Sequence, residues 1–212
     1  MYTYLSLIFS GDFYITILAH TPHLFAQITQ PEGIPYILIP RHSSENCKYI
    51  PTSFFGPNNV AADSCLIVPS GTHFHFGVMQ STLHMSWVRY VCGRLKSDYR
   101  YSKDLVYNNY PWPMDATEAQ IANVTSCAQT VLDARSNHPE SSLADLYHTT
   151  TMPLDLRKAH EALNKAVDAC YRKESFKNER ERVEYLFGLY RKLTEGFSTE
   201  EKPMKLKKKK LE

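Results

Sequence analysis

The pattern of apolar and polar positions divides the chain into two parts of different texture. Residues 1–113 hold short apolar runs rich in β-branched and aromatic side chains, separated by Pro, Gly and Asn, a pattern typical of strands and turns. One helix interrupts them at residues 81–93, where apolar residues recur at helical spacing and Gly93 suits a C-terminal cap. The predicted strands are residues 13–18, 36–39, 64–68 and 72–77.

After Pro113 the spacing of apolar residues becomes helical and stays so to about residue 196. Asp115 is a candidate cap for the first helix, Pro153 a candidate start for the second, and Gly196 follows the third. Residues 143–147 predict a short helical turn between the first two. The apolar stripes are Ile121, Val124, Ala128, Val131 and Leu132; Leu156, Leu163, Val167 and Cys170; and Val183, Leu186, Phe187, Tyr190 and Leu193.

These patterns predict an α+β fold in three parts. Residues 1–113 form a β-rich domain, and residues 114–197 form a small bundle of amphipathic helices. Residues 198–212 form a Lys-rich tail that we expect to be disordered. The net charge of +2 hides an uneven distribution, because the stretch from Lys202 to Glu212 carries +5 and the rest therefore −3. Any affinity of the body for a polyanion must come from a local patch.

The cysteines and the N-terminus bear on the compartment. The chain has 5 cysteines, an odd number without a CxxC pair, which favours free thiols in a reducing compartment and speaks against a structural zinc site. The first 20 residues are apolar but contain Asp12 and no early basic residue, so they make a poor signal peptide and too short a membrane span. We therefore expect a cytoplasmic protein without membrane contact.

The signatures of common enzymes are missing from the sequence: GxSxG, the Walker loop, HExxH and GxGxxG do not occur. The stretch 108–113, NNYPWP, superficially resembles the Asn-Pro-Pro-Tyr motif of adenine methyltransferases, but Tyr110 follows Asn109 where that motif needs proline. His73 and His75 alternate on a predicted strand and would face one side, where surface or packing roles are favoured over a metal pair. Cys92 is interpreted as a buried thiol rather than a nucleophile.

The densest candidate chemistry lies at residues 93–102, GRLKSDYRYS. In an extended strand, alternation would place Arg94, Lys96, Asp98 and Arg100 on one face. Lys and Arg can donate to guanine O6 and N7, and Asp can accept from cytosine N4, so Lys96 and Asp98 together could read one G·C pair. Arg94 and Arg100 would then hold phosphates. The alternative is a solvated strand with cross-strand ion pairs.

A second polar cluster, residues 41–46 (RHSSEN), follows the apolar run 36–39 and sits at a strand end or loop. Arg, Ser and Asn commonly contact phosphates and base edges. The alternative is an ordinary polar loop.

Four stretches of the sequence together resemble one known family. They are residues 21–25 (TPHLF), 39–45 (IPRHSSE), 84–89 (HMSWVR) and the long run 92–113 (CGRLKSDYRYSKDLVYNNYPWP). They are similar to the C-terminal part of type IIL restriction–modification enzymes, the MmeI-like DNA methyltransferases. The helical stretches 142–147, 151–171 and 176–193 resemble the helical end of the same proteins. The resemblance covers residues 20–195.

The resemblance implies that this chain is a target-recognition domain followed by a C-terminal helical bundle. In that family an endonuclease domain and an adenine-N6 methyltransferase domain come first, and S-adenosylmethionine binds in the latter, so no cofactor is expected in this chain. The implied partners are double-stranded DNA and those two domains, in cis or as a separate chain. Residues 1–19 depart from the family pattern, and Cys47 stands where a basic residue is expected. The candidate DNA-binding residues are Arg41, Ser43, Ser44, Arg94, Lys96, Asp98, Arg100 and Tyr101.

Three functions compete at this stage. The first is a sequence-specific DNA recognition module of an adenine-N6 methyltransferase or restriction enzyme, without the catalytic domain. The second is a non-catalytic protein–protein interaction module, in which the helices dock a partner. The third is a small hydrolase that uses His73, His75 or Cys92. Salt-dependent DNA binding separates the first two, because phosphate contacts release counterions.

Overall fold

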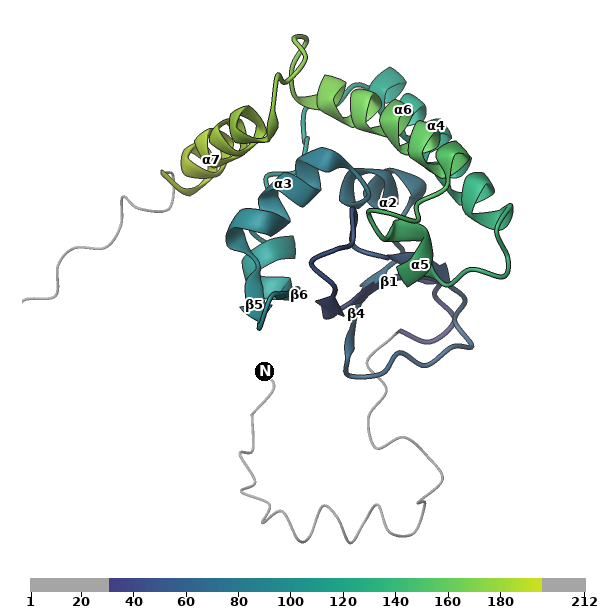
Figure 1. Cartoon of the computed structure of the whole chain (residues 1–212). Coiled ribbons are helices and arrows are strands. Elements are labelled where there is room, and N and C mark those ends of the chain that lie inside the picture. The colour runs from purple at the N-terminus through teal and green to yellow at the C-terminus, as the bar shows by residue number, and fades with distance from the viewer. Residues whose placement is uncertain (1–30, 196–212) are drawn as a thin grey trace, which may run out of the picture.

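The computed structural model describes residues 31–195 of the chain. Two small antiparallel sheets lie on one side and helices cover the other (Figure 1). The predicted strand at 13–18, the motif at 21–25, the cap at Gly196 and the Lys-rich tail lie outside the described residues. The α+β prediction is confirmed for the described part.

The first sheet has the strand order β3-β1-β4, with β1 at Tyr36–Pro40, β3 at Ser53–Phe55 and β4 at Cys65–Pro69. The strands predicted at 36–39 and 64–68 thus exist. The second sheet has the order β2-β6-β5, with β2 at His42–Ser43, β5 at Gly93–Leu95 and β6 at Asp98–Arg100. Only Arg41 separates β1 from β2, so the two sheets are joined directly.

The strand predicted at 72–77 is wrong, because this segment forms helix α2, His73–Met79. Thr72 and His75 close a capping box at its start, with the Thr72 backbone N–H donating to His75 Nδ1 over 3.2 Å. This local pairing overrides the β propensity of the alternating His and Phe residues. A Cβ atom at Gly77 would lie 2.8 Å from Val124 Cγ1, so glycine is needed where α2 approaches the helix at Glu118–Ser136.

Helix α3, Thr82–Val91, confirms the helix predicted at 81–93, with Ser81 as its N-cap and Cys92 rather than Gly93 as its C-cap. A short π-helix, η1 (Lys103–Tyr107), follows the second sheet. The Trp87 indole N–H of α3 donates to the carbonyl of Val106 in η1 over 3.1 Å. The stretch 108–113 therefore follows a helical turn rather than a strand.

The C-terminal part contains α4 (Glu118–Ser136), α5 (Leu143–Tyr147), α6 (Leu154–Tyr171) and α7 (Glu179–Glu195). Helix α4 starts from a capping box formed by Thr117 and Gln120, not from Asp115 as predicted, because only Thr117 completes the reciprocal hydrogen bonds. Pro153 precedes α6, as predicted.

The helices do not form the simple three-helix arrangement that their stripes predict. Helix α4 packs against α6 and α2, whereas α7 lies against α3 (Figure 1). The ring of Trp87 in α3 lies 5.2 Å from that of Phe187 in α7, and Arg89 pairs with Glu179 over 2.8 Å. The apolar face of α7 therefore covers the helix that leads into the second sheet.

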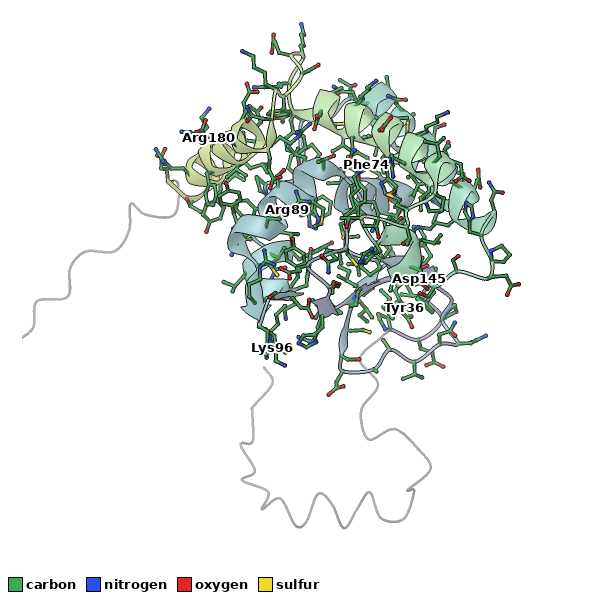
Figure 2. All side chains as sticks on the ribbon, viewed as in Figure 1. Tyr36, Phe74, Arg89, Lys96, Asp145 and Arg180 are labelled. Atoms are coloured by element: carbon green, nitrogen blue, oxygen red, sulfur yellow. The ribbon has the colours of Figure 1, made fainter. Side chains whose placement is uncertain are left out.

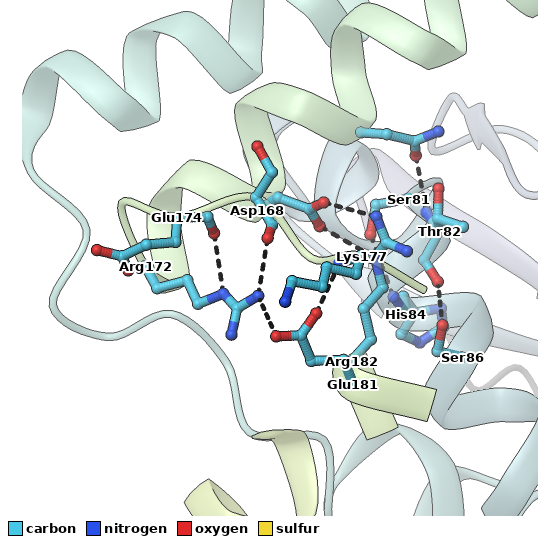
Figure 3. A network of polar contacts seen from close by, with 12 residues as sticks. Ser81, Thr82, His84, Ser86, Asp168, Arg172, Glu174, Lys177, Glu181 and Arg182 are labelled. Atoms are coloured by element: carbon cyan, nitrogen blue, oxygen red, sulfur yellow. Dashed lines mark hydrogen bonds and ion pairs between the residues drawn. The ribbon is translucent and has the colours of Figure 1, made fainter. Parts of the chain in front are cut away.

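Ion pairs hold the connection between α6 and α7 (Figure 3). Arg182 donates to Asp168 over 2.8 Å, and Arg172 pairs with Glu181 over 2.9 Å. The guanidinium of Arg172 also lies 3.7 Å from the centre of the Phe176 ring. These contacts fix the start of α7 and so its place against α3.

A polar network is buried between the first sheet and the helices. Arg135 donates to the Tyr147 hydroxyl over 2.7 Å and to the carbonyl of Thr52 over 2.8 Å. The Tyr147 hydroxyl lies 3.0 Å from Nε2 of His160, whose Nδ1 lies 3.1 Å from the carbonyl of Gln80. Burial, and then the charge of Arg135, lower the pKa of His160 to about 3. The network joins both halves of the chain in one interior.

No helix among residues 31–195 is long and apolar enough to cross a membrane.

Candidate nucleic-acid interface

The second sheet brings together the two polar segments identified in the sequence, residues 41–46 and 93–102. Strand β2 from the first segment pairs with β6 from the second, in the register His42 with Arg100 and Ser43 with Tyr99. The backbone N–H of Tyr101 donates to the carbonyl of Arg41 over 2.7 Å and extends this pairing. The two separately predicted clusters are therefore one surface.

The prediction of a single extended strand through residues 94–100 is wrong. Strands β5 and β6 form a hairpin in which Leu95 faces Asp98, so Lys96 and Ser97 make a two-residue turn. Lys96 has φ +56°, the left-handed conformation that such turns require. Asp98 and Arg100 share one face of β6, while Lys96 lies at the exposed tip, away from the helices (Figure 2).

Arg94 is held in place by two contacts within the hairpin. Its guanidinium lies 3.9 Å from the centre of the Tyr99 ring, a cation–π arrangement. Its Nη1 donates to the carbonyl of Ser97 over 2.8 Å, which also supports the turn. Because Tyr99 is buried, its ring is held in place and fixes the position of the Arg94 guanidinium.

Asp98 connects the hairpin to the polar loop after β2. Its Oδ1 accepts the backbone N–H of Glu45 over 3.1 Å. Within the loop, the Ser44 hydroxyl accepts the backbone N–H of Asn46 over 3.2 Å. The loop and the hairpin are thus fixed relative to one another, and the carboxylate of Asp98 is exposed yet oriented.

Arg41 lies where the two sheets meet. Its Nε donates to the carbonyl of Asp63 over 2.8 Å. A hollow of about 400 Å³ opens beside it and contains three arginines and no acidic residue. A second hollow of about 680 Å³, between β4 and η1, shares Arg41 and Ser102 with the first. The smaller hollow, which we call the basic hollow, is lined by Arg41, His42, Gly93, Arg94, Arg100, Tyr101, Ser102 and Leu105.

Two of the predicted DNA-binding side chains are buried. Tyr101 is 2% exposed, and its hydroxyl lies 3.0 Å from Nε2 of His84 in α3. Burial lowers the pKa of His84 to about 3, so this pair is neutral in the folded protein. Ser43 is 8% exposed. We therefore assign the Tyr101 side chain to the core and leave it out of the proposed DNA-contacting surface.

The residues considered for a hydrolase or metal site do not come together. The side chain of His75 caps α2, and the ring of His73 lies 4.9 Å from that of Phe54. Cys92 is buried, and burial raises the pKa of its thiol, which opposes nucleophilic use. Within residues 31–195, no group of three His, Cys, Asp or Glu residues is placed to hold a metal ion.

Sequence reasoning missed His42, Ser102 and Leu105 as parts of the basic hollow. The spacing of His42 gives no signal, because its neighbour Arg100 lies far along the chain. Leu105 is 55% exposed, and an exposed leucine beside arginines becomes visible only once the fold is known.

Comparison with known proteins identifies the family of this chain. The target recognition domain of MmeI matches residues 14–114, and the C-terminal domain of MmeI matches residues 116–198. The chain is 36% identical over 178 residues to DNA methyltransferase A of Bacillus subtilis (strain 168), a match that covers 84% of this chain and 20% of that protein. It is also similar to a solved structure of the type IIL restriction–modification enzyme MmeI in complex with DNA. That match has a TM-score of 0.79 and 42% identity, and covers 89% of this chain and 25% of the other.

The chain belongs to the MmeI-like family and carries the family's target recognition domain and C-terminal domain in that order. It spans a fifth of the length of the curated relative and a quarter of that of the solved chain.

Proposed function

We propose that this chain is the sequence-specific DNA recognition module of an adenine-N6 DNA methyltransferase or restriction enzyme. One observation carries the proposal: the β2-β6-β5 sheet gathers Arg41, Arg94, Lys96 and Arg100 on an exposed surface of a protein whose body is otherwise acidic. Local basic clusters of this kind bind the phosphate backbone of DNA.

Within this surface, Lys96 and Asp98 read one G·C pair in the major groove. In the hairpin, Lys96 lies in the turn and Asp98 directly after it, instead of both lying on one face of a continuous strand. Lys96 projects from the tip, where its ammonium group is free to approach guanine O6 and N7. Asp98, the first residue of β6 after the turn, is oriented by the backbone N–H of Glu45 and presents acceptors for the amino group of cytosine. A two-stranded β-ribbon such as the β5–β6 hairpin can enter the major groove of B-DNA.

The test is the salt dependence of DNA binding by the 212-residue chain. We expect the triple variant Arg41→Ala, Arg94→Ala, Arg100→Ala to bind a mixed-sequence duplex more weakly and to flatten the salt slope by about 1 for each lost phosphate contact. The matched control removes the same charge from exposed positions of α6, with Arg157→Ala, Lys158→Ala and Lys165→Ala. Equal slopes for the two variants would contradict the proposal and favour the protein–protein module.

The chemistry of methyl transfer and of cleavage belongs, in this proposal, to methyltransferase and endonuclease domains that join this module in cis or as a separate chain. S-adenosylmethionine then binds there, because the sequence of this chain contains no glycine-rich cofactor loop. Calorimetric titration of the chain with the cofactor should give no measurable heat of binding. A micromolar dissociation constant would overturn this part.

We further propose a cytoplasmic location. All 5 cysteines lie among the described residues and none forms a disulfide, as expected in a reducing compartment.

A further inference from the structure

The basic hollow differs from an ordinary charged surface in how its arginines are held. Arg41 donates one hydrogen bond to the backbone carbonyl of Asp63, and Arg94 donates one to the backbone carbonyl of Ser97. The donor–acceptor distance is 2.8 Å in each case. One bond of this kind uses a single N–H and leaves the remaining donors of the fork available. The side chains have therefore lost rotamer freedom before any ligand arrives.

The surroundings of the two tethered arginines favour an anion. Arg100 and His42 line the same hollow from paired positions of β6 and β2. No carboxylate lines it. The Asp98 carboxylate accepts the backbone N–H of Glu45, and the contact of Arg41 with Asp63 is to the backbone carbonyl of that residue. The remaining wall contains the hydroxyl of Ser102 and the exposed side chain of Leu105, one polar and one apolar.

We infer that this hollow is a built site for one phosphodiester group of the DNA. Arg41 and Arg94 act as preset donors to its oxygens, and Leu105 lies against the adjoining deoxyribose. The inference rests on the proposed function and adds to it a fixed anchor point, distinct from the tip residues that read the bases. A guanidinium group held in place can donate two hydrogen bonds to one phosphate group in addition to its charge. The ammonium group of lysine cannot reproduce this bidentate geometry.

The experiment replaces each tethered arginine by lysine, which keeps the positive charge but removes the planar guanidinium group with its several N–H donors. We expect Arg41→Lys and Arg94→Lys each to weaken binding of a mixed-sequence duplex by about tenfold, the weight of one charge-assisted hydrogen bond. The matched control is Arg157→Lys on the exposed face of α6, which should bind as the unchanged chain does. Melting temperatures of all variants verify that the fold is intact.

A second measurement uses inorganic phosphate as the probe. At matched ionic strength, phosphate should raise the melting temperature of the unchanged chain above its value in chloride, and Arg94→Lys should remove this difference. If both lysine variants bind DNA as tightly as the unchanged chain, the hollow is a diffuse basic patch and the inference fails. It also fails if phosphate binds but DNA affinity is insensitive to both changes. Either result leaves the proposed function standing, because the alanine triple variant tests that separately.

Discussion

The arginines of two regions of this molecule differ in their exposure and in their hydrogen bonds. In the buried network, Arg135 is 8% exposed and lies between the rings of Phe76 and Tyr147, each 4.9 Å from its guanidinium carbon. It donates inward, to Tyr147 and Thr52, and no ion pair to it occurs within residues 31–195. In the basic hollow, Arg41 and Arg94 are exposed and donate only one bond each.

The two regions differ in the exposure of the arginine donors, because those of Arg135 are enclosed by the protein whereas those of Arg41 and Arg94 lie at the surface. Donors used inside the protein stabilise the fold, and donors left at the surface are available to a ligand. Changes in the buried network should therefore move stability and leave DNA affinity alone, whereas changes in the hollow should do the reverse.

The largest expected effect is a loss of stability in acid. Burial lowers the pKa values of His84 and His160 to about 3 in the folded protein, from the ordinary histidine value of 6.5. Because the unfolded chain takes up protons first, their contribution is complete above pH 6.5 and falls as the pH drops from 6.5 toward 3. Between pH 6.5 and 5 each should cost about 2 kcal/mol, or about 4 kcal/mol together.

Urea denaturation at pH 7 and pH 5 measures this loss. In the variant His160→Gln the pH dependence should be about half as steep, whereas a change at the partly exposed His148 should leave it unaltered. A steepness that His160→Gln does not change would show that other groups control the acid response.

Removal of the buried arginine should have the next largest effect. We expect Arg135→Ala to lower the free energy of unfolding by about 3 kcal/mol, because two hydrogen bonds to a charged group are lost. The exposed control Arg157→Ala should stay within about 0.5 kcal/mol. Below its melting temperature the Arg135→Ala protein should bind DNA with unchanged affinity. Weakened binding by the folded variant would break the separation between the two regions.

Exchange of the reading pair should change sequence preference and leave stability nearly unchanged. In an enzyme that includes the catalytic domains, Lys96→Glu with Asp98→Arg should favour the opposite orientation of one base pair, with each contact worth about 1–3 kcal/mol of discrimination. Site selection from a random pool measures the preference. Asp98→Asn serves as a control that can still accept from the Glu45 backbone without the charge. An unchanged base at every position would make Lys96 and Asp98 ordinary surface residues.

The smallest expected effect concerns Tyr101. Tyr101→Phe removes the hydrogen bond to His84 and should cost about 1 kcal/mol of stability. Because the hydroxyl is buried, the affinity for DNA should not change. A clear loss of affinity with an intact fold would return Tyr101 to the binding surface.

The sequence predicts this fold where the signal is local. The helix at Thr82–Val91 has apolar residues at helical spacing and the strand at Tyr36–Pro40 is a short apolar run, and both exist. The turn at Lys96 and Ser97 was missed because neither residue is the Gly or Asn that usually marks such a turn. The helix at His73–Met79 was missed because its alternating aromatic residues are typical of strands, while its capping box depends on a histidine in place of Glu or Gln.

The candidate surface shows the same limit. Its residue types were identified from sequence, since Arg, Lys and Asp near tyrosines are typical of DNA contacts. Their arrangement was not, because it depends on pairing between His42 and Arg100, which are distant in the chain. The burial of Tyr101 likewise follows from contact with His84, a partner that alternation along one strand does not reveal.

The positive φ of Lys96 has a consequence for how new target specificities can arise. A left-handed backbone at the hairpin tip excludes β-branched residues and accepts unbranched or small polar ones. Lysine, glutamate, asparagine and aspartate therefore all suit this position, whereas valine, isoleucine and threonine do not. Those permitted residues include both hydrogen-bond donors and acceptors. In the proposed function, the turn thus limits position 96 to a small set of side chains, and one of them can replace another without a change of the backbone.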